Sequence, residues 1–176
     1  FINKIDRLIT ELKLTPRQIE NKLTRIVNNF NNLIELHAEH DFTHKWKINP
    51  KQGNATFGSA LHKWAFTLET AQQQNIKFTD IDDAYKNQSY QKLQTILPIS
   101  KTTLDMAVKH LPSPKEAQQY RIPKIWKGNQ NTPIGQAIIN CTDNGPTTIY
   151  ITNTQTDPKN GTVATGRLYS GQIKPN

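Results

Sequence analysis

An amphipathic helix of about four turns, between residues 15 and 34, is the feature that most constrains the fold of this chain. Its start is well marked: Thr15 is a good N-cap, Pro16 suits the first helical position, and Gln18 follows the cap by three residues, as in a capping box. Apolar residues then recur at helical spacing at Ile19, Leu23, Ile26, Val27, Phe30, Leu33 and Ile34. One apolar stripe of this kind needs a sheet or another helix to cover it, and the neighbouring segments must supply that cover.

Short strand-like segments flank this helix. Phe1-Ile2 is typical of the end of an apolar strand, and a second strand is predicted near residues 55–57. A further helix is expected after Ser59, with an inward face of Leu61, Trp64, Ala65 and Leu68. The segment from 70 to 100 is weakly patterned and helical in pieces, and a last helix is predicted at about 103–110. This order of strand, turn and helix predicts the α/β class for residues 1–111.

A domain boundary is predicted at residues 112–121, because Pro112 and Pro114 disfavour helix before them. Ser113-Pro114-Lys115-Glu116 can cap a further short turn there. From about residue 122 to 176 the sequence is β-rich. Residues 147–152 alternate as in a strand, 157–161 give a strong turn signal, and 163–169 return as a partner strand. So few strands fit into this length that we expect only the first part of a β-barrel.

The composition narrows the class of protein. Hydrophobic residues make up 35% of the chain and no apolar run approaches the roughly 20 residues that span a bilayer, so we expect no membrane association. The single Cys141 fits a cytoplasmic protein. The net charge of +8 has two interpretations, an aid to encounter with a polyanion such as RNA or a solvated Lys-rich surface.

Asn3-Lys4-Ile5-Asp6 directly follows the first apolar strand end, where ligands bind in open α/β sheets. A carboxylate at Asp6 can accept hydrogen bonds from both N1–H and the 2-amino group of guanine, which adenine cannot offer. Asn3 can bond the base edge and brace a neighbouring loop, and the methylene stem of Lys4 can lie along the base. The alternative is a polar turn in which Asp6 caps the next helix.

A second guanine-selective element stands at the next strand end, Phe57-Gly58-Ser59-Ala60-Leu61. A backbone N–H at Ala60 could donate to O6 of guanine, where adenine carries an amine. If one base touches both elements, Asn3 and Ala60 must lie within about 15 Å of each other, since a guanine ring is far smaller than that.

Together these motifs resemble those of the translation elongation factor 2 family, the ribosomal translocases of archaea and eukaryotes. Residues 1–8 and 11–16 are similar to the fourth guanine-nucleotide motif of the family, and 57–61 to the fifth. The likeness continues at 110–114, 117–118, 120–123, 140–141 and 164–171, and the short gap between residues 61 and 110 is closer to the archaeal type.

The resemblance implies a C-terminal part of a P-loop GTPase (G) domain followed by the start of a translation-factor barrel. It implies binding of GTP or GDP through Asn3, Lys4, Asp6, Ser59, Ala60 and Leu61, with no catalytic and no metal-binding residue in this chain. It further implies a cytoplasmic monomer that hydrolyses GTP and moves tRNA and mRNA on the ribosome, in contact with rRNA and ribosomal proteins.

We expect the chain to be an internal fragment, because it has no initiator Met and shows none of the motifs that bind phosphate or Mg²⁺. Alone it should therefore hydrolyse no GTP. Two other functions stay open: a non-enzymatic ribosome- or RNA-binding module on a decayed G fold, and another translational GTPase such as a bacterial-type translocase. His37, His40 and His44 have spacings that could ligate a metal, but surface histidines are the simpler interpretation.

Overall fold

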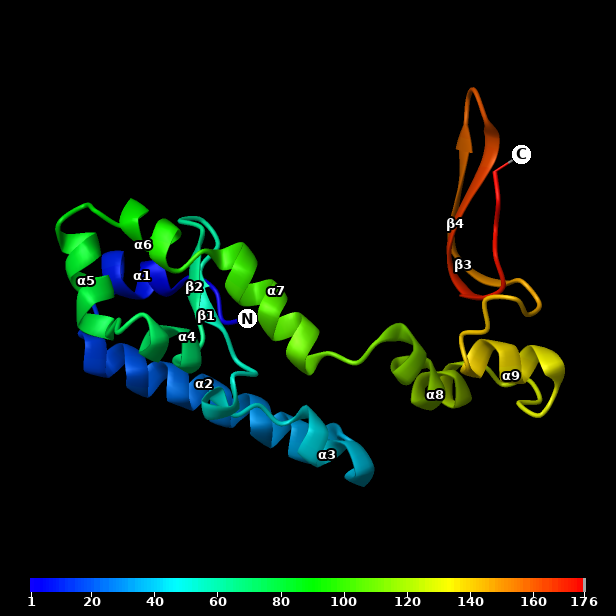
Figure 1. Cartoon of the computed structure of the whole chain (residues 1–176), viewed down its shortest axis with the longest axis horizontal. Coiled ribbons are helices and arrows are strands. Elements are labelled where there is room, and N and C mark those ends of the chain that lie inside the picture. Colours follow the sequence, from blue (N-terminus) through cyan, green and yellow to red (C-terminus); the bar gives the residue numbers. More distant parts are fainter. Residues whose placement is uncertain (176) are drawn as a thin grey trace. The chain divides into compact units, whose positions relative to one another are not determined.

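The computed structural model describes residues 1–175, and the chain separates into two units, Phe1–Leu111 and the part that begins at Pro112. Figure 1 shows both along the chain, the first in blue to green and the second in yellow-green to red. Helices and small antiparallel sheets occur together, which agrees with the predicted α/β class at that coarse level.

The first unit contains seven α-helices, one 3₁₀ turn and one β-hairpin. In chain order these are α1 (Ile5–Thr10), α2 (Pro16–His37), α3 (His40–Trp46), η1 (Pro50–Gln52), β1 (Phe57–Ser59), β2 (Trp64–Phe66), α4 (Leu68–Gln73), α5 (Phe78–Lys86), α6 (Gln91–Ile96) and α7 (Ile99–His110). The predicted helical pieces between 70 and 100 are α4, α5 and α6, and the predicted helix at 103–110 is the larger part of α7.

Helix α2 starts where the sequence predicts it. The Thr15 hydroxyl accepts from the Gln18 N–H, and the Gln18 side chain accepts from the Thr15 N–H at 2.9 Å, so the capping box is complete. Its first turns bury Ile19, Leu23 and Val27 against the hairpin and α5, whereas the C-terminal part of the stripe is half-exposed. Packing therefore fixes the N-terminal half, whereas the C-terminal half is held by Asn31, which bonds both the N–H and the carbonyl of Ile48 at 2.8 Å.

Replacing Thr15 with Ala should lower the free energy of unfolding by about 1 kcal/mol, because the Gln18 N–H at the start of α2 loses its partner. Thr24→Ala is the matched control: the Thr24 hydroxyl only bonds back to the Glu20 carbonyl within the same exposed helix face. It should change stability by less than about 0.5 kcal/mol. Urea denaturation of both variants measures the difference, and equal losses would contradict the role of the cap.

The segment after Ser59 forms a strand where a helix was predicted, and this expectation was wrong. Ser59 Oγ does accept from the N–H of His62 at 3.1 Å, as an N-cap would. The turn nevertheless stops at Lys63, whose φ of 57° is left-handed, and β2 then pairs antiparallel with β1, Gly58 facing Ala65. Aromatic side chains in β2 favour a strand once a partner strand is present.

The hairpin is held on both sides. On one side Ile2, which ends the predicted first strand, forms a parallel bridge to Phe57. On the other, the Ala65 N–H donates to Leu97 O at 2.9 Å and the buried Thr102 hydroxyl donates to Ala65 O at 3.1 Å, which ties β2 to α7. The core around it consists of Ile5, Ile9, Ile19, Leu23, Val27, Ala55, Phe57, Trp64, Phe66, Ile81, Leu93 and Leu97.

The second unit contains two helices and one long hairpin within the described residues: α8 (Pro114–Ile125), α9 (Pro133–Ile139), β3 (Thr148–Asp157) and β4 (Gly161–Ser170). The hairpin and its turn confirm the two predicted strands, with Asp157 Oδ1 accepting from the N–H groups of Lys159 and Asn160 at 2.8 Å each. Helix α9, which follows a well-capped Thr132-Pro133 start, is an element that the β-rich expectation for residues 122–176 did not include.

Residues 112–121, predicted as a linker, are mostly helix in the structure. Ser113 caps α8 by accepting from the Glu116 N–H, and Pro114 occupies the first helical turn. Within the same helix the buried Gln118 donates to the carbonyls of Ile138 and Tyr169, which connects α8 to α9 and β4. This segment is thus packed within the second unit.

Candidate functional site

The two motifs singled out in the sequence meet through one hydrogen bond. Asn3 Oδ1 accepts from the Ala60 N–H at 2.9 Å, across 57 positions of sequence, and from the N–H of Lys4 at 2.8 Å. The expectation that Asn3 and Ala60 lie within about 15 Å is therefore confirmed, as is the role of Asn3 in bracing a neighbouring loop. The same bond occupies the Ala60 N–H that was expected to face a base.

Pairing of the backbone places the two loops at one end of the sheet. The Ile2 N–H donates to Thr56 O at 2.7 Å, and the Gly58 N–H donates to Ile2 O at 3.1 Å. This parallel alignment means that the residues following each strand, from Asn3 and from Ser59, leave the sheet in the same direction. An edge of this kind is where α/β folds bind ligands.

The first loop passes from strand to helix through a left-handed residue. Lys4 has φ 69° and ψ 32°, a conformation uncommon for a residue with a side chain, and it stands at the N-cap position of α1. Asp6 lies in the first turn of α1 with only 5% of its surface exposed, whereas Asn3 and Lys4 are exposed. A carboxylate in the first turn of a helix is favoured by the partial positive charge there.

The second loop has two consecutive exposed residues. Ser59 is fully buried, and Ala60 and Leu61 are exposed, Leu61 by 75%. Within residues 1–175 the Leu61 N–H donates no hydrogen bond, while the Ala60 N–H is held by Asn3. Leu61 thus does not face inward as predicted, and its amide is the unoccupied donor of this loop.

A polar and aromatic cluster supports the second loop from inside. The hydroxyl of Tyr85, on α5, lies 2.9 Å from Trp64 Nε1 and 2.7 Å from His62 Nδ1, and the His62 ring packs on Tyr90 at 4.3 Å between centroids. Burial raises the pKa of Tyr85 to about 12, with the negative charge of Asp6 adding to the rise while bonds from Trp64 and Ser59 oppose it. The Tyr85 hydroxyl therefore stays protonated at neutral pH.

Sequence reasoning missed Tyr85. It lies in the weakly patterned segment between 70 and 100, and no motif includes it. Its role follows from α5 packing beside α1 and α6, which no local pattern reveals.

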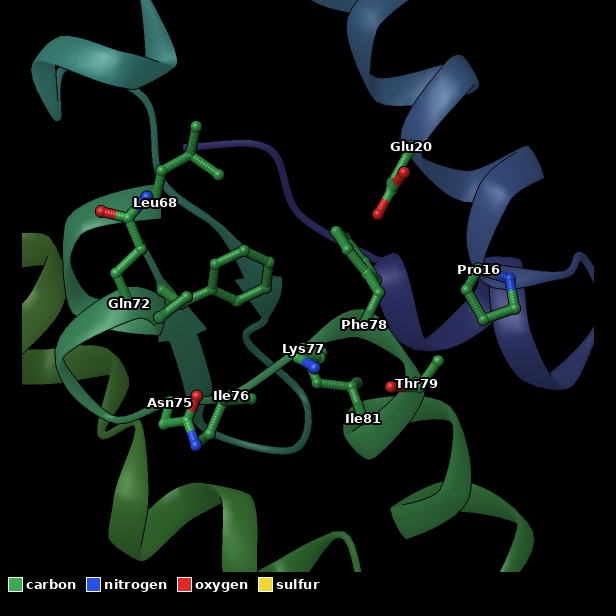
Figure 2. A pocket seen from close by; sticks show the side chains of 12 residues that line it. Pro16, Glu20, Leu68, Gln72, Asn75, Ile76, Lys77, Phe78, Thr79 and Ile81 are labelled. Atoms are coloured by element: carbon green, nitrogen blue, oxygen red, sulfur yellow. The ribbon is translucent and has the colours of Figure 1, made fainter.

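The hollow drawn in Figure 2 is separate from these loops. It has a volume of about 480 Å³ and lies between α2, α4 and α5, with Pro16 and Glu20 on one side, Leu68 and Gln72 on the other, and the Phe78 ring between them. Neither Asn3-Lys4-Ile5-Asp6 nor Ser59-Ala60-Leu61 contributes to its lining. Its lining is mainly apolar in area.

Other potential sites have little support. Among residues 1–175 no three or more His, Cys, Asp or Glu side chains gather as they would around a metal ion. His37 is the last residue of α2, while His40 and His44 lie on α3. In the same part of the chain no helix is long and apolar enough to cross a bilayer.

Comparison with known proteins gives close relatives of one kind. The chain is 47% identical over 174 residues to elongation factor 2 of Pyrobaculum calidifontis and 45% identical over 174 residues to that of Pyrobaculum arsenaticum. It is 44% identical over 176 residues to elongation factor 2 of Staphylothermus marinus. Each match covers 99% of this chain, and the chain spans about a quarter, 24%, of each relative. No family model matches.

Proposed function

The chain belongs to the elongation factor 2 family, and from this premise we propose that it is the guanine-reading part of a translation factor that binds and hydrolyses GTP and promotes movement of tRNA and mRNA on the ribosome. The observation that carries the proposal is the Asn3–Ala60 hydrogen bond of 2.9 Å, because it brings two guanine-selective elements to one sheet end. Chance resemblance of two short motifs would not bring them into contact.

Each of the six residues expected to bind the nucleotide has a role in this proposal: Asn3, Lys4, Asp6, Ser59, Ala60 and Leu61. The Asp6 carboxylate accepts from N1–H and the 2-amino group of guanine, and the Lys4 stem lies along the base. Asn3 joins the two loops and Ser59 supports the second from inside. O6 of guanine then accepts from the free amide of Leu61, and from the amide of Ala60 if Asn3 shares or releases it.

In domain terms, residues 1–111 form the C-terminal part of a G domain and residues 122–176 belong to a β-barrel domain. Residues 112–121 connect the two domains. GTP and GDP are the nucleotides, and Mg²⁺ would polarise and neutralise the phosphates. The sequence shows no phosphate-binding motif, and the chain spans 24% of its relatives. We therefore propose that the phosphate and Mg²⁺ contacts come from other parts of such a protein, and that these 176 residues alone do not hydrolyse GTP.

Ribosomal RNA and ribosomal proteins are the proposed partners, with tRNA and mRNA moved on the ribosome by a monomeric, cytoplasmic factor. The net charge of +8 supports association with RNA, because each phosphate that a cation neutralises releases counterions.

Nucleotide competition in a version of the protein at the full length of its relatives tests the proposal. GDP should bind at least about tenfold more tightly than ADP, since adenine loses charge-assisted bonds to Asp6. Addition of ribosomes should then raise GTP hydrolysis. Equal affinity for GDP and ADP would favour the non-enzymatic RNA-binding module instead.

A further inference from the structure

Tyr85 occupies a place that connects the loop Ser59–His62 to the rigid core. Its hydroxyl meets His62 Nδ1 at 2.7 Å and Trp64 Nε1 at 2.9 Å. We propose that Tyr85 is a positioning residue for guanine recognition, which holds the backbone donors of this loop in place to meet O6 of the base. The inference rests on the proposed guanine-binding function and adds to it a residue outside both sequence motifs.

The anchor on the core side is firm. Trp64 is fully buried in β2, and that strand is hydrogen-bonded to β1 on one side and to the 97–99 segment on the other. The indole N–H of Trp64 can only donate, so the Tyr85 oxygen accepts from it. Tyr85 keeps its own proton, which it can donate to the loop.

The loop side receives that contact through His62. The N–H of His62 donates to Ser59 Oγ at 3.1 Å, and its ring is enclosed between the Tyr85 hydroxyl and the Tyr90 ring. The turn from Ser59 to His62 is therefore fixed at both of its ends. Ala60 and Leu61, between these ends, are the residues whose N–H groups would meet the base.

Tyr85 also adjoins the other base-reading motif. The charge of Asp6 acts on the Tyr85 hydroxyl, and α5 packs against α1. One side chain thus contacts the loop that meets O6 and lies near the carboxylate that meets N1–H. Loss of the Tyr85 hydroxyl should disturb the placement of this loop relative to the Asp6 carboxylate, while the packing of the Tyr85 ring stays in place.

Affinities for GDP and for 6-thio-GDP, measured calorimetrically in the full-length protein, test the inference. Sulfur is a weak hydrogen-bond acceptor, so 6-thio-GDP keeps the bonds to Asp6 but loses most of the bond to the loop. Tyr85→Phe should weaken GDP binding about fivefold and 6-thio-GDP binding less than about twofold. Tyr90→Phe keeps the stacked ring and removes a hydroxyl that takes no part in the bonds of Tyr85. It should change neither the affinity for GDP nor that for 6-thio-GDP.

His62→Phe removes the same bond from the loop side and keeps a ring on Tyr90. It should reproduce the GDP-selective loss, and the double variant should lose no more than either single one, because both changes break one interaction. An equal loss for GDP and 6-thio-GDP would overturn the positioning role and leave guanine recognition intact. An unsubstituted protein that does not prefer GDP to ADP would instead overturn the proposed function itself.

Discussion

Replacing Asp6 with Asn should move the preference of the full-length protein from GTP to XTP. In guanine the 2-amino group is a donor, and the Asn side chain would meet it with a donor of its own. In xanthine that position is a carbonyl oxygen, which the Asn side-chain amide can bond while its oxygen still accepts from N1–H. The loss of one charge-assisted bond costs about 1.5 to 3 kcal/mol, so GTP should bind at least about tenfold more weakly.

The burial of Asp6 makes this a large effect. With 5% of its surface exposed, the carboxylate has little water to replace a lost partner. Competition of GTP and XTP for the unsubstituted protein and the Asp6→Asn variant measures the change directly, and the ratio of the two affinities should shift by about 100-fold. Asp6→Ala is the control, because it should weaken GTP at least about tenfold and gain nothing for XTP. An unchanged GTP preference in the Asp6→Asn variant would show that Asp6 does not face the base.

Much of the first unit could be predicted because its signals are local. The start of α2 at Thr15 and Pro16 is set by capping chemistry that four residues determine, and the structure shows the same bonds. The contact between Asn3 and Ala60 could be predicted only through function, because two elements that read one base must lie together. The distance between them is not contained in either motif alone.

The error after Ser59 has a tertiary cause. A Ser followed by apolar residues predicts a capped helix, and the His62 N–H does bond to Ser59 Oγ as that helix would require. What decides against the helix is pairing of β2 with β1, its neighbour in the hairpin, and with residues 97–99, which come from a distant part of the chain. Propensity gives way to such packing wherever partner strands are available.

The role of Tyr85 and the full length of α8 were missed for related reasons. Tyr85 gains its role from residues of another segment, and nothing in its own neighbourhood marks it. The sequence predicts only a short capped turn at Ser113–Glu116, whereas the structure continues this turn as α8 to Ile125. The buried Gln118 then fixes α8 to α9 and β4.

The close packing of the hairpin leads to the second large effect, that of Gly58→Ala. A methyl group at this position would lie 2.7 Å from the Ala65 Cα and closer still to the Trp64 carbonyl oxygen, both of them backbone atoms. Side-chain rotation cannot relieve such contacts, so the two strands must move apart. We expect a loss of about 3 kcal/mol in the free energy of unfolding, together with weaker nucleotide binding, because the strand leads directly into Ser59-Ala60.

Two comparisons separate this explanation from a general sensitivity of glycines. Gly161 in the β3–β4 turn has a φ of +75° and no atom within 4 Å of an added Cβ, so Gly161→Ala should cost only the strain of that conformation, about 1 to 2 kcal/mol, and leave nucleotide affinity unchanged. Combining Gly58→Ala with Ala65→Gly removes the opposing methyl group, which lies at 2.9 Å, but leaves the backbone contacts. Urea denaturation should therefore show no recovery of stability in the double variant. If the second change restores it, the clash is between side chains and the β1–β2 backbones are not the reason that position 58 is glycine.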